Sequence, residues 1–210
     1  MAGPNLTYHE QIGSVESTSN STPLTASIPE KLSQTFKIGT PVQLSGGFVQ
    51  AWDGTTVAAG IAGFSLIPAS NLASSGKGAP TPFGQIGPPG AIQTYGNVPY
   101  QASAVNIAEG TPITDGRTLF EQAVGNTIFE GQFDNSAGTV AADYTPTQAS
   151  IGTQYGLTID ANGQWYVDAG KVTPGTNTVV TVVGINPIDG LIVNARVRFV
   201  VLASARQLPN

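Results

Sequence analysis

The chain has 210 residues, of which 40% are hydrophobic and 10% charged, and it carries no cysteine and a formal net charge of -5. The lack of cysteine excludes a disulfide framework, thiol catalysis and cysteine-ligated zinc. Only eight Lys and Arg residues are present and they form no run, so nucleic acid is not an expected partner.

Residues 1–35 are predicted to form an extended N-terminal arm. The stretch from Ser14 to Thr22 is too polar to offset the entropy of ordering by burial. Leu6, Tyr8 and Ile12 alternate with polar residues, as in a strand that adds to another sheet, so we expect them to contact a partner. A disordered tail is the alternative for this segment.

The sequence shows no targeting or membrane signal. Its start lacks the basic and apolar regions of a signal peptide, and no stretch reaches the about 18 consecutive apolar residues of a membrane span. We therefore expect a protein that is not exported by the usual route and that makes no membrane contact.

Residues 36–149 are predicted to form a β module. Between Phe36 and Leu66, extended apolar runs are separated by the turn signals Ser45-Gly46-Gly47 and Asp53-Gly54. This spacing is typical of a β meander.

A long loop, residues 68–99, is predicted to be inserted in this module. Its 32 residues include six Pro, six Gly and a single charge, Lys77, which excludes a regular strand throughout. Loops of this length inside a compact domain are usually functional or linkers. Low charge and spaced apolar residues favour a loop that lies on another surface, and a mobile linker is the alternative. The expected contacts are Phe83, Ile86, Ile92 and Tyr95.

Residues 150–210 are predicted to form a second β module packed on the first. A hairpin is expected where the alternating stretch from Tyr155 to Ile159 ends near the turn Asn162-Gly163. From Val193 to Val201 the odd-numbered positions are apolar, which predicts a half-buried antiparallel strand.

Glycine and proline leave little room for helices, because either residue is costly in a helix interior. The short candidates at 100–109 and 117–124 are ambiguous. The predicted fold class is therefore mainly β, with antiparallel β-barrel or sandwich modules, an extended N-terminal arm and a long Pro/Gly-rich loop. The tripeptide Ile38-Gly39-Thr40 recurs as Ile151-Gly152-Thr153. Either two related modules or chance explains this repeat.

No group of residues points to catalysis, a cofactor or a metal, so the chain is not expected to be an enzyme. The only histidine, His9, is expected at the surface of the polar arm, with no cysteine or G-x-S-x-G motif to act with. Asp160 to Gly163 lacks the remaining ligands of a calcium loop and predicts a hairpin turn. A carboxylate pair for sugar hydrolysis stays open among Glu109, Glu121, Glu130, Asp134 and Asp143.

Several runs of the sequence resemble a known family. They are IGTPVQLSGGFVQAWDGTTVAAGIAGFSL, IGTQYGLTIDANGQWYVD, VVTVVGINP and the closing RVRFVVL, and they lie within residues 36–66 and 150–203. These runs are similar to the head decoration, or cement, proteins of tailed bacteriophages. The resemblance implies a mainly β protein, commonly a trimer, that sits outside an assembled head and braces neighbouring major capsid subunits with an N-terminal arm. The loop at 68–99 departs from the compact members of that family.

The expected function is that of a structural virion protein on the outer surface of the capsid, made in the host cytoplasm. Its expected partners are the major capsid protein and other copies of the chain, with a trimer favoured. A polar arm and an apolar-spotted loop agree with this role, because extended segments that order on binding can wrap a large surface.

The alternative is a surface or carbohydrate binding module of a fibre or surface layer. In that case Trp52, Trp165 and Tyr166 are the stacking platforms for a sugar. Packing of these aromatic rings in the core is the favoured interpretation, and burial of both tryptophans distinguishes the two.

Overall fold

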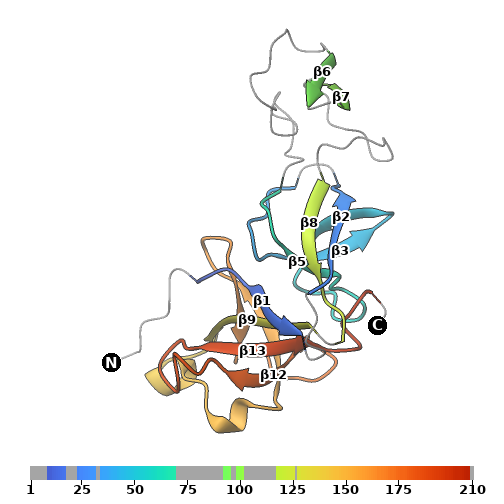
Figure 1. Ribbon diagram of the computed structural model, residues 1–210. Helices are drawn as coiled ribbons and strands as arrows, with labels where there is room; N and C mark the ends of the chain where they lie inside the picture. The colour runs from blue at the N-terminus through green and yellow to red at the C-terminus, as the bar shows by residue number, and fades with distance from the viewer. Residues whose placement is uncertain are drawn as a thin grey trace.

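The computed structural model describes residues 9–17, 23–31, 34–69, 92–95, 98–101, 117–125 and 127–208 (Figure 1). This part of the chain is mainly β, as predicted, with a closed five-stranded barrel and a second, larger sheet. Its helical segments are two short 3-10 helices, η1 (Ala141–Tyr144) and η2 (Gln148–Ser150). No helix in the described ranges has the length and apolar character needed to cross a membrane.

The five-stranded barrel combines residues from both sides of the inserted segment. Its antiparallel neighbours are, in order, β2 (Thr25–Pro29), β8 (Arg117–Gln122), β5 (Gly63–Ser65), β3 (Pro41–Ser45) and β4 (Phe48–Ala51). A parallel bridge between Glu30 and Val49 joins the end of β2 to β4 and closes the barrel. In Figure 1 the barrel lies above the second sheet.

The six-stranded sheet holds most of the C-terminal half of the chain. Its order is β1 (Gly13–Ser17), β9 (Thr127–Asp134), β11 (Trp165–Asp168), β10 (Gln154–Ile159), β12 (Val180–Ile185) and β13 (Arg196–Val201). Because β13 also pairs with β9, the strands β9, β11, β10, β12 and β13 form a closed ring in that order. A separate hairpin is formed by β6 (Ile92–Tyr95) and β7 (Val98–Gln101).

The strands predicted between Phe36 and Leu66 are present, but they do not form a meander. β5 pairs with β3 instead of with its predecessor β4. The reason is that residues 52–62 leave the barrel, and Trp52 and Ile61 pack in a core that includes the six-stranded sheet.

The period-two pattern of the last strand is confirmed, with a later start. Positions 197, 199 and 201 are buried in β13, whereas Arg196 and Arg198 are partly exposed. The strand begins at Arg196 and not at Val193, because Asn194 adopts a left-handed conformation with φ of 56° that interrupts extended backbone.

The predicted N-terminal arm is wrong for the described residues 9–17 and 23–31. β1 pairs with β9 of the six-stranded sheet, and β2 pairs with β8 of the barrel. Ile12, expected to contact a partner, is 2% exposed and packs in the main core of its own chain. Polar stretches can enter sheets because the backbone supplies the hydrogen bonds, which side-chain composition does not report.

The boundary predicted between modules 36–149 and 150–210 also differs from the structure. The chain passes from the barrel to the six-stranded sheet between β8 and β9, near residues 123–127. The stretch 117–124, a candidate helix in the sequence, contains β8. β9 belongs with the later strands because Phe129 and Phe133 lie in the same buried cluster as residues of β10 to β13.

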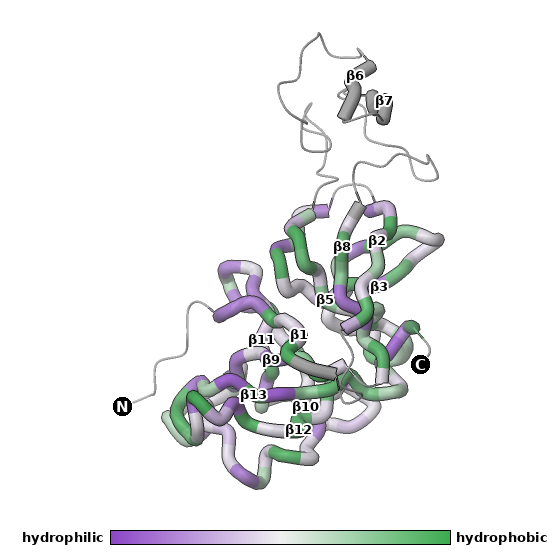
Figure 2. The backbone as a smooth tube through the Cα atoms, viewed as in Figure 1, coloured by the Kyte–Doolittle hydropathy of each residue, from purple (hydrophilic) through white to green (hydrophobic). Residues whose placement is uncertain are grey.

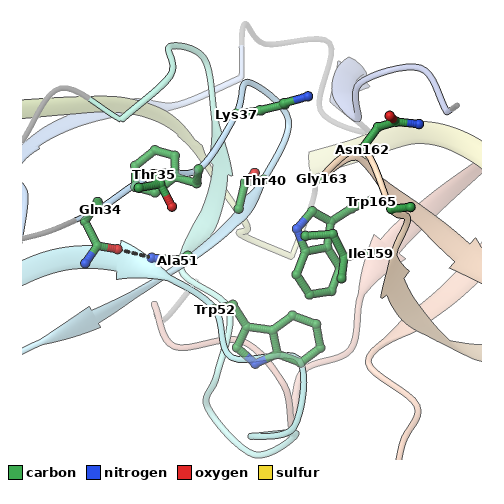
Figure 3. Close-up of a pocket in the computed structure, with 12 residues that line it drawn as sticks. Gln34, Thr35, Lys37, Thr40, Ala51, Trp52, Ile159, Asn162, Gly163 and Trp165 are labelled. Carbon is green, nitrogen blue, oxygen red and sulfur yellow. Dashed lines mark hydrogen bonds between the residues drawn. The ribbon is translucent and has the colours of Figure 1, made fainter. Parts of the chain in front are cut away.

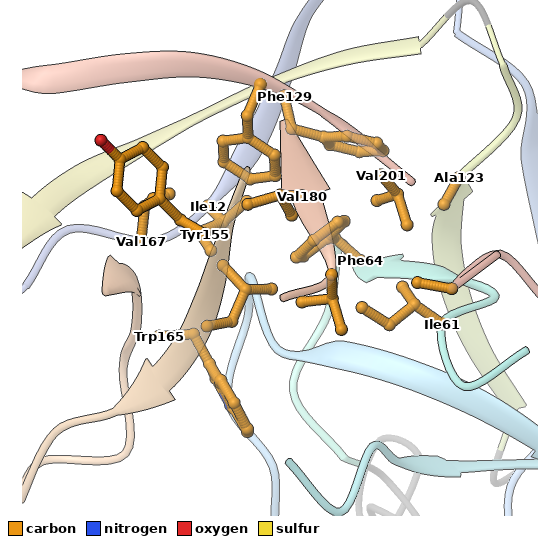
Figure 4. Close-up of a cluster of buried hydrophobic side chains, with 14 of the residues drawn as sticks. Ile12, Ile61, Phe64, Ala123, Phe129, Tyr155, Trp165, Val167, Val180 and Val201 are labelled. Atoms are coloured by element: carbon orange, nitrogen blue, oxygen red, sulfur yellow. The ribbon is translucent and has the colours of Figure 1, made fainter. Parts of the chain in front are cut away.

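The barrel and the six-stranded sheet share one hydrophobic core (Figure 4). Phe64 of β5 packs against Phe129 of β9, with ring centroids 4.5 Å apart, and against Phe199 of β13 at 6.0 Å. A smaller cluster around Phe36, Val42, Val49 and Phe120 fills the barrel itself. The barrel and the six-stranded sheet therefore pack against each other through buried side chains of both.

The residues after β13 return to the barrel. Arg206 forms a parallel bridge with Ile61, and the Gln207 side chain accepts from the Leu44 N–H and donates to the Leu44 carbonyl, both at 2.6 Å. Arg206 and Gln207 therefore add contacts between the barrel and the segment that follows β13, in addition to the shared core.

The two repeated Ile-Gly-Thr segments have the same local geometry. Gly39 and Gly152 each occupy a turn with positive φ, of 79° and 84°, immediately before β3 and β10. Each strand pairs with the next in a hairpin; Trp52 directly follows β4, Trp165 begins β11, and the two rings meet with centroids 5.3 Å apart. The sequence echo thus marks equivalent turns on the two sides of the shared core.

We expect Phe64→Ala to destabilise the whole molecule, because it empties the contact between barrel and sheet. The expected loss is about 3–5 kcal/mol of unfolding free energy, as for other buried phenylalanines. Phe48→Ala, at a partly exposed position of β4, is the matched control and is expected to cost less. Urea unfolding followed by both tryptophan fluorescence and far-ultraviolet circular dichroism measures this. Equal losses in the two variants would contradict the shared-core description.

Candidate functional site

A cavity of about 460 Å³ lies where the barrel meets the six-stranded sheet (Figure 3). The segments before and after β3 and β4 form one side of it, and β10 with its hairpin turn forms the other. Its lining residues are Gln34, Thr35, Phe36, Lys37, Thr40, Ala51, Trp52, Ile159, Ala161, Asn162, Gly163 and Trp165.

Short loops with internal hydrogen bonds hold the two tryptophans of this cavity. Trp52 Nε1 donates to the Thr56 carbonyl oxygen at 2.8 Å, and the carboxylate of Asp53 accepts from the Thr55 and Thr56 N–H groups. The side-chain hydrogen bond from Thr56 lowers the pKa of Asp53 to about 2. Asp160 accepts from the backbone N–H groups of Asn162 and Gln164 in the same way, ahead of Trp165.

These contacts confirm the predicted turns. Gly54 and Gly163 have φ of 76° and 80°, and the Asp160 carboxylate accepts from the Asn162 and Gln164 N–H groups within its hairpin turn. Within the described ranges, no group of three or more His, Cys, Asp and Glu side chains is arranged to hold a metal ion.

The aromatic residues proposed as sugar platforms are buried. Trp52, Trp165 and Tyr166 are 3%, 5% and 6% exposed, as the core-packing interpretation predicts. Sugar stacking needs an open ring face, so the structure removes the feature on which the carbohydrate-binding alternative depended.

His9 is buried, and the expectation of a surface position is wrong. It is 1% exposed, with Nε2 2.8 Å from Asp134 Oδ2 and Nδ1 3.0 Å from Asp160 Oδ2. Its ring stacks on Tyr166 with centroids 4.2 Å apart. Two carboxylates on opposite ring nitrogens favour the doubly protonated imidazolium, which donates to both.

The pKa values of this cluster follow from these contacts. Burial alone lowers the pKa of His9, but the hydrogen bonds to Asp134 and Asp160 and their charges outweigh it and raise the pKa above its usual value. Burial alone raises the pKa of Asp160, but hydrogen bonds from Gln164 and His9 hold it below its usual value. The cluster is thus a buried ionic clasp between the N-terminal segment and the six-stranded sheet.

A second feature is the exposed apolar loop at residues 188–193, between β12 and β13. Ile188 is 87% exposed, Leu191 and Ile192 are each 58% exposed, and Val193 is 37% exposed. Figure 2 colours the backbone by residue hydropathy, and the loop lies between the strands labelled β12 and β13. Exposed apolar side chains that follow one another this closely form a candidate interaction surface.

Polar contacts hold the exposed apolar loop in place. Arg196 donates from Nε and Nη2 to the two carboxylate oxygens of Asp189, at 2.8 and 2.9 Å. These side-chain hydrogen bonds lower the pKa of Asp189 to about 2. Asn186 accepts from the Ile188 N–H through its side chain, and the Asn194 N–H donates to the carbonyl oxygen of Tyr144, the last residue of η1.

The residues expected to contact a partner are not gathered by the described structure into one site. Leu6, Tyr8, Phe83 and Ile86 lie outside the described residues. Ile92 and Tyr95 are the ends of β6, where only the strand pairing with β7 is described. Ile12 lies in the core.

The carboxylates considered for sugar hydrolysis have structural partners where they are described. Glu121 accepts from the Ser14 N–H, Asp143 accepts from the Thr139 and Val140 N–H groups, and Asp134 meets His9. Glu130 contacts Asn186 and Arg196, and Glu109 lies outside the described residues. Each of the four described carboxylates thus has a hydrogen-bond or ionic partner within the protein.

Sequence reasoning missed both the cavity and the exposed apolar loop. The cavity joins residues 34–52 to residues 159–165, and no local pattern reports such a meeting. The apolar residues that follow Asp189-Gly190 could have indicated an exposed loop. The alternation that continues into β13 instead led to a strand prediction from Val193.

A comparison with known protein families, curated proteins and solved structures finds no match to this chain.

We expect folding stability to fall as pH rises through the His9 pKa. A raised pKa in the folded state gives stability that is fully present below the unfolded value of about 6.5 and is lost above the folded value. Urea unfolding of the wild type between pH 6 and pH 9 measures this loss, and His9→Gln is expected to lack it. His9 is the single histidine, and the terminal amine is common to both proteins. The same pH dependence in both would overturn the ionic clasp.

Proposed function

We propose that this chain is a structural virion protein that binds the outside of an assembled phage capsid and stabilises it by bridging neighbouring major capsid subunits. The observation that carries this proposal is the exposed apolar loop at residues 188–193, which is held by hydrogen bonds and turned to solvent. The resemblance of the sequence to head decoration proteins supports the choice of partner.

The loop offers apolar area that a partner surface can bury. Full burial of an aliphatic side chain of the size of Ile188, Leu191 or Ile192 contributes roughly 1.5–3 kcal/mol. Part of this gain is lost to the cost of association, so a single loop supports a modest affinity. Modest affinity is sufficient where many equal sites are repeated over a lattice.

The anchoring of the loop reduces the cost of binding. The bidentate contact of Arg196 with Asp189 and the cap from Asn186 fix the backbone before any partner arrives. A pre-ordered loop loses less conformational entropy when it docks than a free one does. This rigid loop takes the place of the free N-terminal arm that the sequence suggested.

Stabilisation of the capsid follows from linkage. A protein that binds only the assembled lattice stabilises the assembled state by its binding free energy, summed over the sites. A homo-oligomer, with a trimer favoured by the resemblance, presents several copies of the loop, and its second contact benefits from a high effective concentration. The proposed place is the outer capsid surface, after synthesis in the host cytoplasm, and the role needs no catalysis, cofactor or metal.

We expect the protein to raise the temperature at which the particles of its phage release their genome. The double variant Leu191→Asp with Ile192→Asp is expected to lose this effect, because it puts charges where apolar contacts form. Release is measured with a DNA-binding dye during heating, on particles saturated with wild type, variant or no protein.

The matched control carries Leu24→Asp and Val172→Asp. Both residues are exposed aliphatic positions outside the 188–193 loop, at 57% and 50% exposure, so this variant is expected to protect as the wild type does. Equal release temperatures with and without wild-type protein would refute the proposed function. Protection by the Leu191/Ile192 variant would show that a different surface binds.

Binding to the particle is expected to survive moderate salt. The chain has only eight basic and thirteen acidic residues, and the exposed apolar loop contributes uncharged side chains to the contact. Charge attraction is screened beyond roughly 8 Å at physiological ionic strength, whereas apolar burial is not. Co-sedimentation at 0.05 and about 0.5 M sodium chloride tests this, and release at the higher concentration would contradict an apolar contact.

A further inference from the structure

The cavity between the barrel and the six-stranded sheet has the properties of a ligand site that is separate from the exposed apolar loop. Its volume of about 460 Å³ lies in the range of small-molecule pockets, which is roughly 300–1,000 Å³. Phe36, Ala51, Trp52 and Ile159 give it an apolar wall, and Lys37 stands at its upper edge in Figure 3.

Trp165, which lines this cavity, has a polar group without a partner among the described residues. The residue is 5% exposed, and its Nε1–H is buried with no hydrogen-bond acceptor among the described residues. Figure 3 shows the ring nitrogen of Trp165 on the side that faces Thr40. The neighbouring Trp52 differs, because its Nε1–H donates to the Thr56 carbonyl.

A buried donor without an acceptor destabilises the folded protein, because it has lost its hydrogen bond to water and formed no other. Indole Nε1–H is a donor only, so it can be satisfied only by an acceptor. A ligand that brings an acceptor into the cavity can therefore accept a hydrogen bond from Trp165 without breaking one that the protein already makes.

The charge around the cavity favours an anionic acceptor. Lys37 is also a donor only, and none of the described lining residues is acidic, although the chain as a whole has a net charge of -5. The Lys37 stem lies over Gly163, where an added β-carbon would be 3.7 Å from Lys37 Cε, so its ammonium extends toward the sheet side of the opening. The nearby carboxylate of Asp160 is occupied by its own turn and by His9.

We propose that this cavity binds a carboxylate carried on a small apolar group. The Trp165 Nε1–H and the Lys37 ammonium donate to the carboxylate oxygens, and the apolar group contacts Trp52 and Ile159. Two sources share this chemistry, a free small organic acid and the C-terminal carboxylate of a partner chain that ends in an apolar residue.

Nuclear magnetic resonance of the ¹⁵N-labelled full chain gives a direct test, because the chain has only two tryptophans and both line the cavity. The probe is 3-phenylpropionate, compared with its amide, 3-phenylpropanamide. We expect the acid to move the Trp165 indole N–H resonance downfield in a saturable manner, with a smaller change at Trp52. Trp165→Phe identifies the resonance by its disappearance.

Lys37→Met tests the charge without disturbing the fold, since Lys37 is exposed and Met keeps an unbranched apolar stem. We expect it to weaken binding of 3-phenylpropionate roughly two- to five-fold, the effect of one exposed ion pair, while Lys37→Arg retains binding. Circular dichroism of each variant confirms that the fold is kept.

The two sources are separated with the peptide acetyl-Gly-Gly-Phe, used as the free acid and as the C-terminal amide. Tighter binding of the peptide acid than of 3-phenylpropionate assigns the site to a chain terminus, and the reverse assigns it to a small acid. The proposal is overturned if neither acid shifts the Trp165 resonance, if the amides shift it equally, or if Lys37→Met binds as the wild type does.

Discussion

The packing of Phe64 against Phe129 and Phe199 is the contact on which the rest of the molecule depends. Phe64 comes from the barrel and its two partners come from the six-stranded sheet, at centroid distances of 4.5 and 6.0 Å. Two small β units gain stability by sharing a hydrophobic interior. This contact fixes how the two parts face each other, and with it the cavity that lies between them.

The buried polar cluster around His9 attaches the N-terminal segment to the six-stranded sheet, as the aromatic cluster attaches the barrel to it. His9 lies between Asp134 and Asp160 and stacks on Tyr166, so a segment with few apolar side chains is nevertheless held to the sheet. A buried ion pair contributes only when its hydrogen bonds are complete. Here both ring nitrogens meet a carboxylate, and β1 continues the attachment along β9.

The two candidate contact features lie in the connections between strands, where a rigid framework displays them. The exposed apolar loop is anchored by the Asp189–Arg196 pair next to β13, and the cavity is framed by turns capped by Asp53 and Asp160. Loops carried by a stiff sheet can change their side chains without loss of the fold. The fold therefore explains how such features are held, and their chemistry decides what they bind.

The sequence by itself determined the features that depend on neighbouring residues. Glycine and proline excluded long helices, the Asn162-Gly163 turn fixed a hairpin, and the alternation before Val201 fixed a strand, because turns and strand faces follow local rules. The tertiary structure alone decided the closure of the barrel, the pairing of β1 and β2 and the burial of His9. Those outcomes depend on contacts between segments that are not neighbours in the sequence, such as the contacts of His9 with Asp134 and Asp160 at separations of 125 and 151 residues, and no local pattern encodes them.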